Sequence, residues 1–123
     1  MKLATCYLVL LVWLSCTPTG IYVVVSNEQD IPVAQVRVSY NAGNPDDLTM
    51  PEILPHQTVY GWLSMEKTPP EDGCYQVWIQ QNGAEKKYPC RGYYTNGGPI
   101  LDTLYIELKK DSVLIIQLAP NLR

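Results

Sequence analysis

The sequence predicts an all-β fold, a β-sandwich of about seven strands that follows an N-terminal signal segment. Three observations support this prediction. Apolar residues after residue 20 occur in short runs or at every second position, which is the period of a strand. Turn-forming residues recur about every 8 to 12 residues, as in sandwich domains. The same part of the chain has no segment with the period of an amphipathic helix. At 123 residues, the chain is long enough for one domain.

Residues 1–15 predict a signal peptide for export. Lys2 is their only charge, and residues 3–14 are apolar except for one threonine. A helix of about twelve residues would span about 18 Å, well short of the ~30 Å hydrocarbon core of a bilayer. A positive start, a short apolar run and small residues at its end are typical of a secretory signal. We therefore expect a signal peptide at 1–15, a short linker at 16–20 and the sandwich at 21–120.

The end of the signal segment, WLSC at residues 13–16, resembles the lipobox of bacterial lipoproteins, in which a small residue precedes a cysteine. The resemblance implies that Cys16 becomes the diacylated N-terminus of the mature protein and anchors it to a membrane. Trp13 departs from the family pattern, which usually has an aliphatic residue at that position. The alternative is cleavage by an ordinary signal peptidase a few residues later, for example after Thr17, Thr19 or Gly20, which would release a soluble secreted protein.

The remaining cysteines predict one disulfide bond. Cys6 lies in the signal segment, so Cys74 and Cys90 are the only pair left for the folded part. An exported protein folds in an oxidising compartment, where such a pair forms a bridge. Two buried free thiols are the alternative. The chain has one His and no CxxC motif, so we expect neither a metal site nor a cofactor.

The first half of the mature chain predicts three strands. The run IYVVV at 21–25 is β-branched and aromatic, a composition typical of strands. After a polar turn at 27–30, residues 33–40 predict a half-buried strand, because polar and apolar side chains alternate from Gln35 to Tyr40. Residues 41–56 contain three Pro and three acidic residues and predict a long loop, with one helical turn or a short edge strand in it. The third strand is expected at 57–65.

The next segment predicts a β-hairpin. Residues 74–80 alternate, with an apolar face opposite the face that carries Trp78. Asn82-Gly83 is the strongest hairpin-turn signal in the chain, and residues 84–88 form the returning strand. Pro89 restricts that strand to a sheet edge or a bulge.

The register of this hairpin is open at the level of sequence. A two-residue turn pairs Val77 with Tyr88, which suits the core, but it puts Cys74 and Cys90 on opposite faces. A three-residue turn brings the cysteines together but pairs Val77 with a lysine. A bulge near Pro89 would satisfy both requirements.

The C-terminal part predicts two more strands. Residues 92–100 are rich in Gly and predict a loop. Residues 101–108 predict a strand, residues 109–112 a turn, and the apolar run at 113–118 a final buried strand.

The run IYVVVSNEQDIPVAQVRVSY at residues 21–40 resembles the opening of transthyretin-like and carboxypeptidase-regulatory-like domains, in which a strand, a polar turn, a Pro and an alternating Val strand follow one another. Residues 73–79 resemble the later segment where a Gly and a Tyr introduce a strand, and residues 113–118 resemble the closing strand. The likeness covers most of residues 20–118 as hydrophobic patterning. It implies an Ig-like or transthyretin-like sandwich, a fold that usually serves as a binding or structural module and carries no activity by itself.

Charge and residue content argue against several functions. The net charge is −3, so we expect no binding to nucleic acid. A triad of Ser64, His56 and Asp72 can be written, but no nucleophile-elbow motif supports it. The acidic pairs at 46–47 and 71–72 lack the ligand spacing of a calcium loop. We therefore expect no catalytic residues and no enzyme activity.

Three aromatic residues are candidates for partner binding. Trp78 lies on the face opposite the apolar face of its strand, and Tyr93 and Tyr94 lie together in a Gly- and Asn-rich segment. Tyr and Trp flanked by Gly are typical of binding surfaces. The alternative is that Trp78 packs under the 41–56 loop and that one of the tyrosines plugs an end of the sandwich.

Taken with the signal segment, these features predict a non-enzymatic exported protein of the cell envelope, a small lipoprotein that acts as a binding or assembly-accessory module. Its expected partner is another protein of the envelope or secretion apparatus, with membrane attachment if Cys16 is modified. The alternative is a soluble secreted effector or inhibitor that binds a host or competitor protein.

Overall fold

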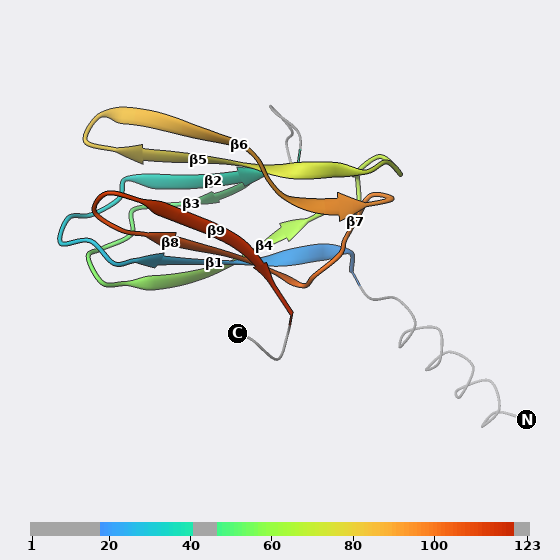
Figure 1. Cartoon of the computed structure of the whole chain (residues 1–123), viewed down its shortest axis with the longest axis horizontal. Coiled ribbons are helices and arrows are strands. Elements are labelled where there is room, and N and C mark those ends of the chain that lie inside the picture. The colour runs from blue at the N-terminus through green and yellow to red at the C-terminus, as the bar shows by residue number, and fades with distance from the viewer. Residues whose placement is uncertain (1–17, 41–46, 120–123) are drawn as a thin grey trace, which may run out of the picture.

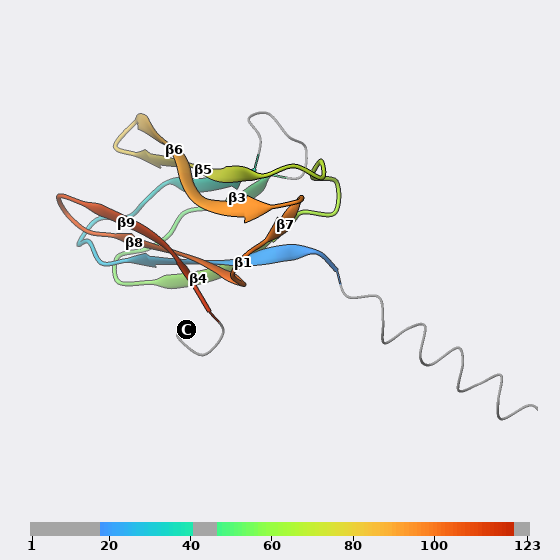
Figure 2. The ribbon, with the colours of Figure 1, turned by 45° about the vertical axis from the view of Figure 1, so that its right-hand side comes forward.

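The structure, a computed structural model, describes residues 18–40 and 47–119, in which nine strands form two sheets packed face to face (Figures 1 and 2). The strands are β1 (Gly20–Asn27), β2 (Gln35–Ser39), β3 (Leu48–Met50), β4 (Thr58–Ser64), β5 (Gly73–Gln81), β6 (Ala84–Thr95), β7 (Gly98–Pro99), β8 (Thr103–Leu108) and β9 (Val113–Leu118). The prediction of an all-β sandwich is confirmed. These ranges contain no helix that could cross a bilayer. The expected signal peptide and Cys16 lie outside the described residues.

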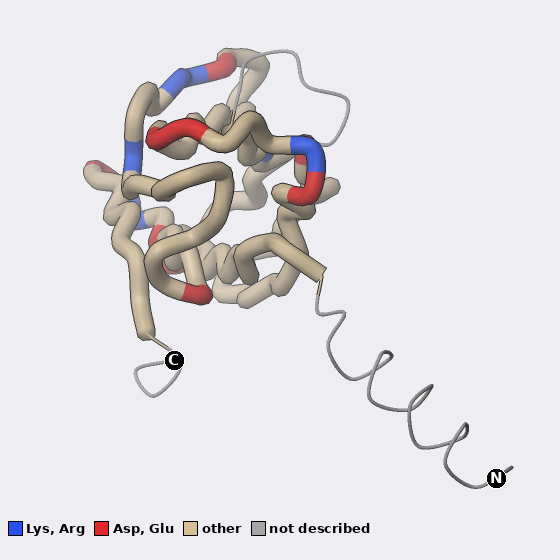
Figure 3. The backbone as a smooth tube through the Cα atoms, turned by 90° about the vertical axis from the view of Figure 1, so that its right-hand side faces the viewer, with Lys and Arg blue, Asp and Glu red and all other residues tan. Residues whose placement is uncertain are grey.

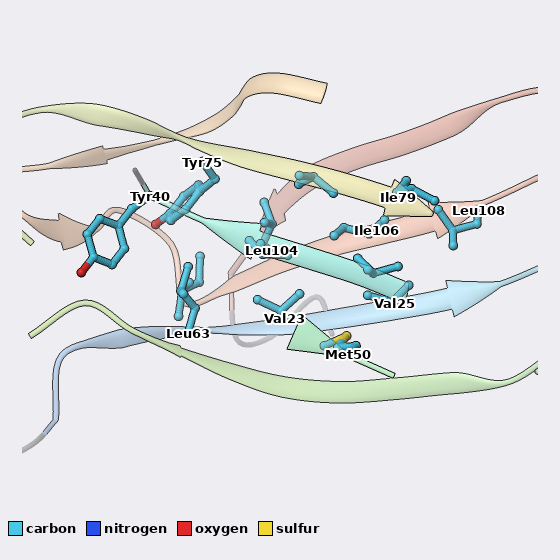
Figure 4. Packing of buried hydrophobic residues seen from close by; sticks show 14 of the residues in the cluster. Val23, Val25, Tyr40, Met50, Leu63, Tyr75, Ile79, Leu104, Ile106 and Leu108 are labelled. Carbon is cyan, nitrogen blue, oxygen red and sulfur yellow. The ribbon is translucent and has the colours of Figure 1, made fainter. Parts of the chain in front are cut away.

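The chain crosses between the two sheets four times, on entering β2, β4, β5 and β8. One sheet has the order β4-β1-β8-β9, and the other has the order β3-β2-β5-β6-β7. In the first sheet, β1 pairs antiparallel with β4 and parallel with β8. This arrangement puts the β-branched run of β1 in the middle of its sheet, where Val23 and Val25 are fully buried. Figure 4 shows both side chains between the two layers, together with Leu104 and Ile106 of β8.

The seven predicted strands all form, and two short ones accompany them. The first addition, β3, is the short edge strand that was one of the alternatives for the 41–56 loop. The second is β7, and here the predicted loop at 92–100 is wrong. β6 continues to Thr95 and reaches β7 through Asn96 and Gly97, both with positive φ. Asn-Gly accommodates such a turn between two strands, so this part of the Gly-rich segment forms a second hairpin.

The β5–β6 hairpin combines a two-residue turn with a bulge, which was the third of the three alternatives. Asn-Gly forms the turn, and Val77 pairs with Tyr88. The register then shifts by one residue, so that Tyr75 pairs with Arg91. The extra residue lies on β6, where Cys90 has a positive φ of 54°. The bulge thus keeps the apolar face of β5 in the core and turns Cys90 toward its partner.

The predicted disulfide joins Cys74 to Cys90, whose Cα atoms are 4.8 Å apart. A second register shift follows, because Cys74 pairs with Tyr93 across the strands. Gly92 lies in that shift with a φ of 72°, a conformation that favours glycine. The disulfide therefore fastens the irregular part of β6 to the regular strand β5.

The final strand differs from its prediction in one respect. β9 was expected to be buried, but it is the last strand of its sheet, and Leu114 and Ile116 are exposed. Val113 and Ile115 are partly buried against the core. A continuous apolar run is found both in central strands and in edge strands with one solvent-exposed face. The sequence pattern alone therefore does not show which of the two β9 is.

Candidate binding surfaces

The three aromatic candidates do not form a common surface, and Tyr94 belongs to the core. Its ring packs against Tyr75 at 5.5 Å and against Tyr40 at 6.5 Å between centroids. Its hydroxyl donates a hydrogen bond of 3.3 Å to the carbonyl of Tyr40. Burial raises the pKa of Tyr94, and the charges of Glu71 and Tyr40 add to that rise. Tyr94 is thus the tyrosine that plugs one end of the sandwich, and it is not available to a partner.

Trp78 points away from the core, as predicted, but the residue is only 7% exposed. It lies on the outer face of the five-stranded sheet between two cations. The Arg37 guanidinium of β2 is 4.2 Å from the ring centroid, and the Lys87 ammonium of β6 is 5.4 Å from it. Both are the cross-strand neighbours of Trp78 in the sheet. The ring therefore makes its cation–π contacts within this chain, which leaves little of it for a partner.

Tyr93 is the one candidate whose ring reaches solvent, with 63% of the residue exposed. Its backbone is held firmly by the side-chain amide of Gln117 in β9. The Tyr93 N–H donates to Gln117 Oε1 at 3.0 Å, and Gln117 Nε2 donates to the Tyr93 carbonyl at 2.8 Å. This clamp joins β6 of one sheet to β9 of the other.

A larger exposed surface lies on the outer side of the four-stranded sheet. Tyr60 is 77% exposed, and Tyr22 and Trp62 are each more than a third exposed. Tyr22 pairs directly with Trp62 across β1 and β4, and their rings meet edge to face at 4.8 Å. The surface continues across the sheet to β9. We call it the aromatic face, and it consists of Tyr22, Tyr60, Trp62, Leu114 and Ile116.

Cross-strand pairs connect the two ends of the aromatic face through a continuous row of side chains. Val24 of β1 pairs with Tyr60 on one side and with Tyr105 on the other, and Tyr105 pairs with Ile116. The row therefore spans all four strands. The outer side of the other sheet is different, because its central strands present Gln35, Arg37, Gln76 and Gln80 there.

Sequence reasoning missed the aromatic face for a definite reason. In residues 59–63, Tyr60 and Trp62 alternate with Val59, Gly61 and Leu63, so both sides of the strand carry apolar residues. Such a strand looks buried on both faces. Gly61 and Leu63 instead face the core, where Gly61 leaves room for other side chains.

The remaining sequence candidates stay apart. His56 is 62% exposed, and its Nε2 is 2.9 Å from Oδ1 of the exposed Asp30. Ser64 lies at the far end of β4, about 20 Å from the end nearest His56. Asp72 accepts a hydrogen bond of 3.0 Å from the N–H of Asn96. The described ranges contain no group of three or more His, Cys, Asp or Glu that could hold a metal ion, and Asp46 lies outside them.

A groove of about 430 Å³ opens between the β5–β6 hairpin and the β8–β9 hairpin. Its apolar lining includes Tyr88, Leu108 and Val113. Lys86 and Lys110 are among its charged residues. In size it is comparable to sites that bind small ligands or short peptide segments.

Comparison with known proteins gives no family for the chain. No family model matches the sequence, and no curated protein matches it. A protein from Eubacterium rectale, solved by NMR, is similar with a TM-score of 0.46 and 14% identity, over 85% of this chain and 94% of that chain. These comparisons indicate no function for this chain.

Proposed function

We propose that the chain is a non-enzymatic exported protein of the cell envelope, a small lipoprotein whose β-sandwich is a binding or assembly-accessory module. The aromatic face is the observation that carries this proposal. Aromatic side chains on a flat, apolar surface are the residues that contribute most to protein–protein contacts. A large contiguous apolar patch on the surface of a small domain is typical of an interaction site.

The sequence before β1 supports a partner at a membrane. Four peptide steps separate Cys16 from Gly20, a reach of about 14 Å at full extension. Tyr22 follows two residues later and pairs with Trp62. A lipid on Cys16 would therefore keep this end of the aromatic face close to the bilayer surface. The partner that we propose is another protein of the envelope or of the secretion apparatus.

The lipid anchor and the contact surface need separate tests. For the anchor, we expect Cys16→Ser or globomycin to block processing, and the mass of the wild-type N-terminus to show a diacylated cysteine. An unmodified N-terminus beyond Cys16, with normal processing in globomycin, would contradict the lipoprotein and favour the soluble effector or inhibitor.

For the contact surface, a photocrosslinking residue in place of Tyr60 should give a defined adduct with an envelope protein in intact cells. Trp62→Ser should reduce that adduct, because it removes the neighbouring ring of the face. Leu54→Ser is the matched control, since Leu54 is also an exposed apolar residue but lies outside the aromatic face. An adduct that Leu54→Ser reduces as much as Trp62→Ser does would contradict the assignment.

A further inference from the structure

The outer edge of β9 lacks the features that protect an edge strand. β9 has the sequence VLIIQL, with no charge and no Pro. It ends its sheet, so no strand of the described ranges pairs with its far edge. Exposed edges of this kind are templates for another strand, and natural proteins usually cover or charge them. β6, across the groove, is protected by Pro89 and by two bulges.

The backbone groups that β9 offers follow from its turn. The N–H of Lys109 donates to the carbonyl of Ser112 at 2.9 Å, which makes these two a hydrogen-bonded pair. Pairs alternate along an antiparallel ladder, so the next pair, Leu108 and Val113, is a non-hydrogen-bonded one. The N–H and C=O groups of Val113 and Ile115 therefore point away from β8, toward the open edge.

The two sides of the sandwich are not equivalent. On one side, Leu48 and Met50 of β3 reach over β4, and a Cβ on Gly61 would come within 2.8 Å of both. On the other side, the clamp between Gln117 and the Tyr93 backbone holds β6 and β9 together. The groove lies by the hairpin turns and reaches β9 at Val113. The open side thus offers backbone partners and apolar walls together.

The charge of the groove selects for an anionic ligand. Three of the seven Lys and Arg residues in the described ranges line the groove, namely Lys86, Lys109 and Lys110. In Figure 3, Lys and Arg residues (blue) lie along the side of the sandwich that β6 and β9 form. Lys109 pairs with Glu107 at 3.2 Å, and the groove lining has one carboxylate, Asp111. The positive balance is therefore local, in a chain whose net charge is −3.

We propose that the open edge of β9 binds an extended acidic peptide segment of a partner protein as an added strand. Main-chain hydrogen bonds to Val113 and Ile115 would supply the pairing. Alternate side chains of the peptide would face the groove, where acidic residues would lie near Lys86 and Lys110. Apolar side chains on its other side would lie beside Leu114 and Ile116. A second copy of this chain fits less well, because its β9 has no acidic residue to offer these lysines. The site adds a second contact to the binding function proposed above and does not need the lipid anchor.

The test uses the purified mature protein and a labelled, end-blocked peptide of alternating Val and Glu. We expect saturable binding at low salt that weakens as salt rises, because the lysines attract the glutamates through solvent. Lys86→Glu with Lys110→Glu should weaken binding about tenfold or more. Lys87→Glu is the matched control, since Lys87 lies over Trp78 on the other face of the sheet, and it should change affinity by less than about twofold.

Two altered peptides separate strand addition from simple charge attraction. Methylation of alternate backbone nitrogens removes donors without changing charge, and it should abolish binding. Replacement of Glu by Lys should do the same. No saturable binding up to about 1 mM, or equal binding of the methylated peptide, would overturn the proposal. A dimer that forms through β9 and excludes the peptide would overturn it as well. None of these outcomes affects the crosslinking test of the aromatic face.

Discussion

The disulfide gives the sharpest test of how the irregular part of β6 is held. We expect Cys74→Ala with Cys90→Ala to lower the free energy of unfolding by about 3 kcal/mol, because the bridge spans a sequence separation of 16 residues. This is a large share of the 5–15 kcal/mol that is typical of a domain. Urea unfolding of the oxidised wild type and of the variant, followed by tryptophan fluorescence, measures the difference. A loss below about 1 kcal/mol would refute the claim that the bridge constrains the unfolded chain.

The positive φ of Cys90 gives a second, independent prediction for the free energy of unfolding. Its φ of 54° lies in the left-handed region, which costs a residue with a Cβ about 1–2 kcal/mol. With the bridge removed in both cases, Cys90→Gly should therefore be more stable than Cys90→Ala by about 1 kcal/mol. The comparison holds the lost bridge constant, so it reports on the bulge alone. An alanine variant as stable as the glycine variant would show that the bulge relaxes once the disulfide is absent.

Three further changes test the core and the clamp. Burial, and then the charge of Tyr94, raises the pKa of Tyr75, so above about pH 10 the native state keeps a proton that the unfolded chain has lost. The free energy of unfolding should therefore fall by about 1.4 kcal/mol per pH unit above that pH. Tyr75→Phe should flatten this fall in urea titrations at pH 9 to 11. Asn27→Asp should lower the free energy of unfolding by about 2–4 kcal/mol in the same assay at pH 7, because the buried amide of Asn27 donates to three backbone carbonyls and a carboxylate cannot. A variant as stable as the wild type would contradict this. Gln117→Leu should speed amide exchange at Tyr93 and cost about 1–2 kcal/mol, whereas unchanged exchange would show that the clamp does not hold β6.

The fold could be predicted from the sequence to the extent that local pattern decides it. Alternation along residues 74–80 identified the face that enters the core, and Asn82-Gly83 identified the turn. The register of the same hairpin could not be derived, because the core pairing and the cysteine pairing required different offsets. Only the bulge at Cys90 reconciles them, and its position depends on contacts between strands that a single strand's sequence does not contain.

The candidate surfaces were harder to predict, since exposure depends on what the other sheet and its edges leave uncovered. Trp78 was assigned to the correct face, but its cationic neighbours Arg37 and Lys87 come from other strands. The Gly-rich sequence around Tyr94 predicts a loop, but the residue lies on an extended β6 that returns to the core. In each case the local pattern gave the direction of a side chain, and tertiary packing decided whether solvent reaches it.

Both proposed contact surfaces meet at β9, and this convergence follows from the alternation of a single edge strand. Leu114 and Ile116 project outward and complete the aromatic face, whereas Val113 and Ile115 project inward against the core, and Val113 also lines the groove. Their backbone groups alternate as well, so the residues whose side chains face inward are also those whose N–H and C=O groups are open to a new strand. A partner that adds a strand to β9 would therefore extend the aromatic face by one strand. The two surfaces can then act on one partner, with the peptide segment giving register and the aromatic side chains giving most of the buried area.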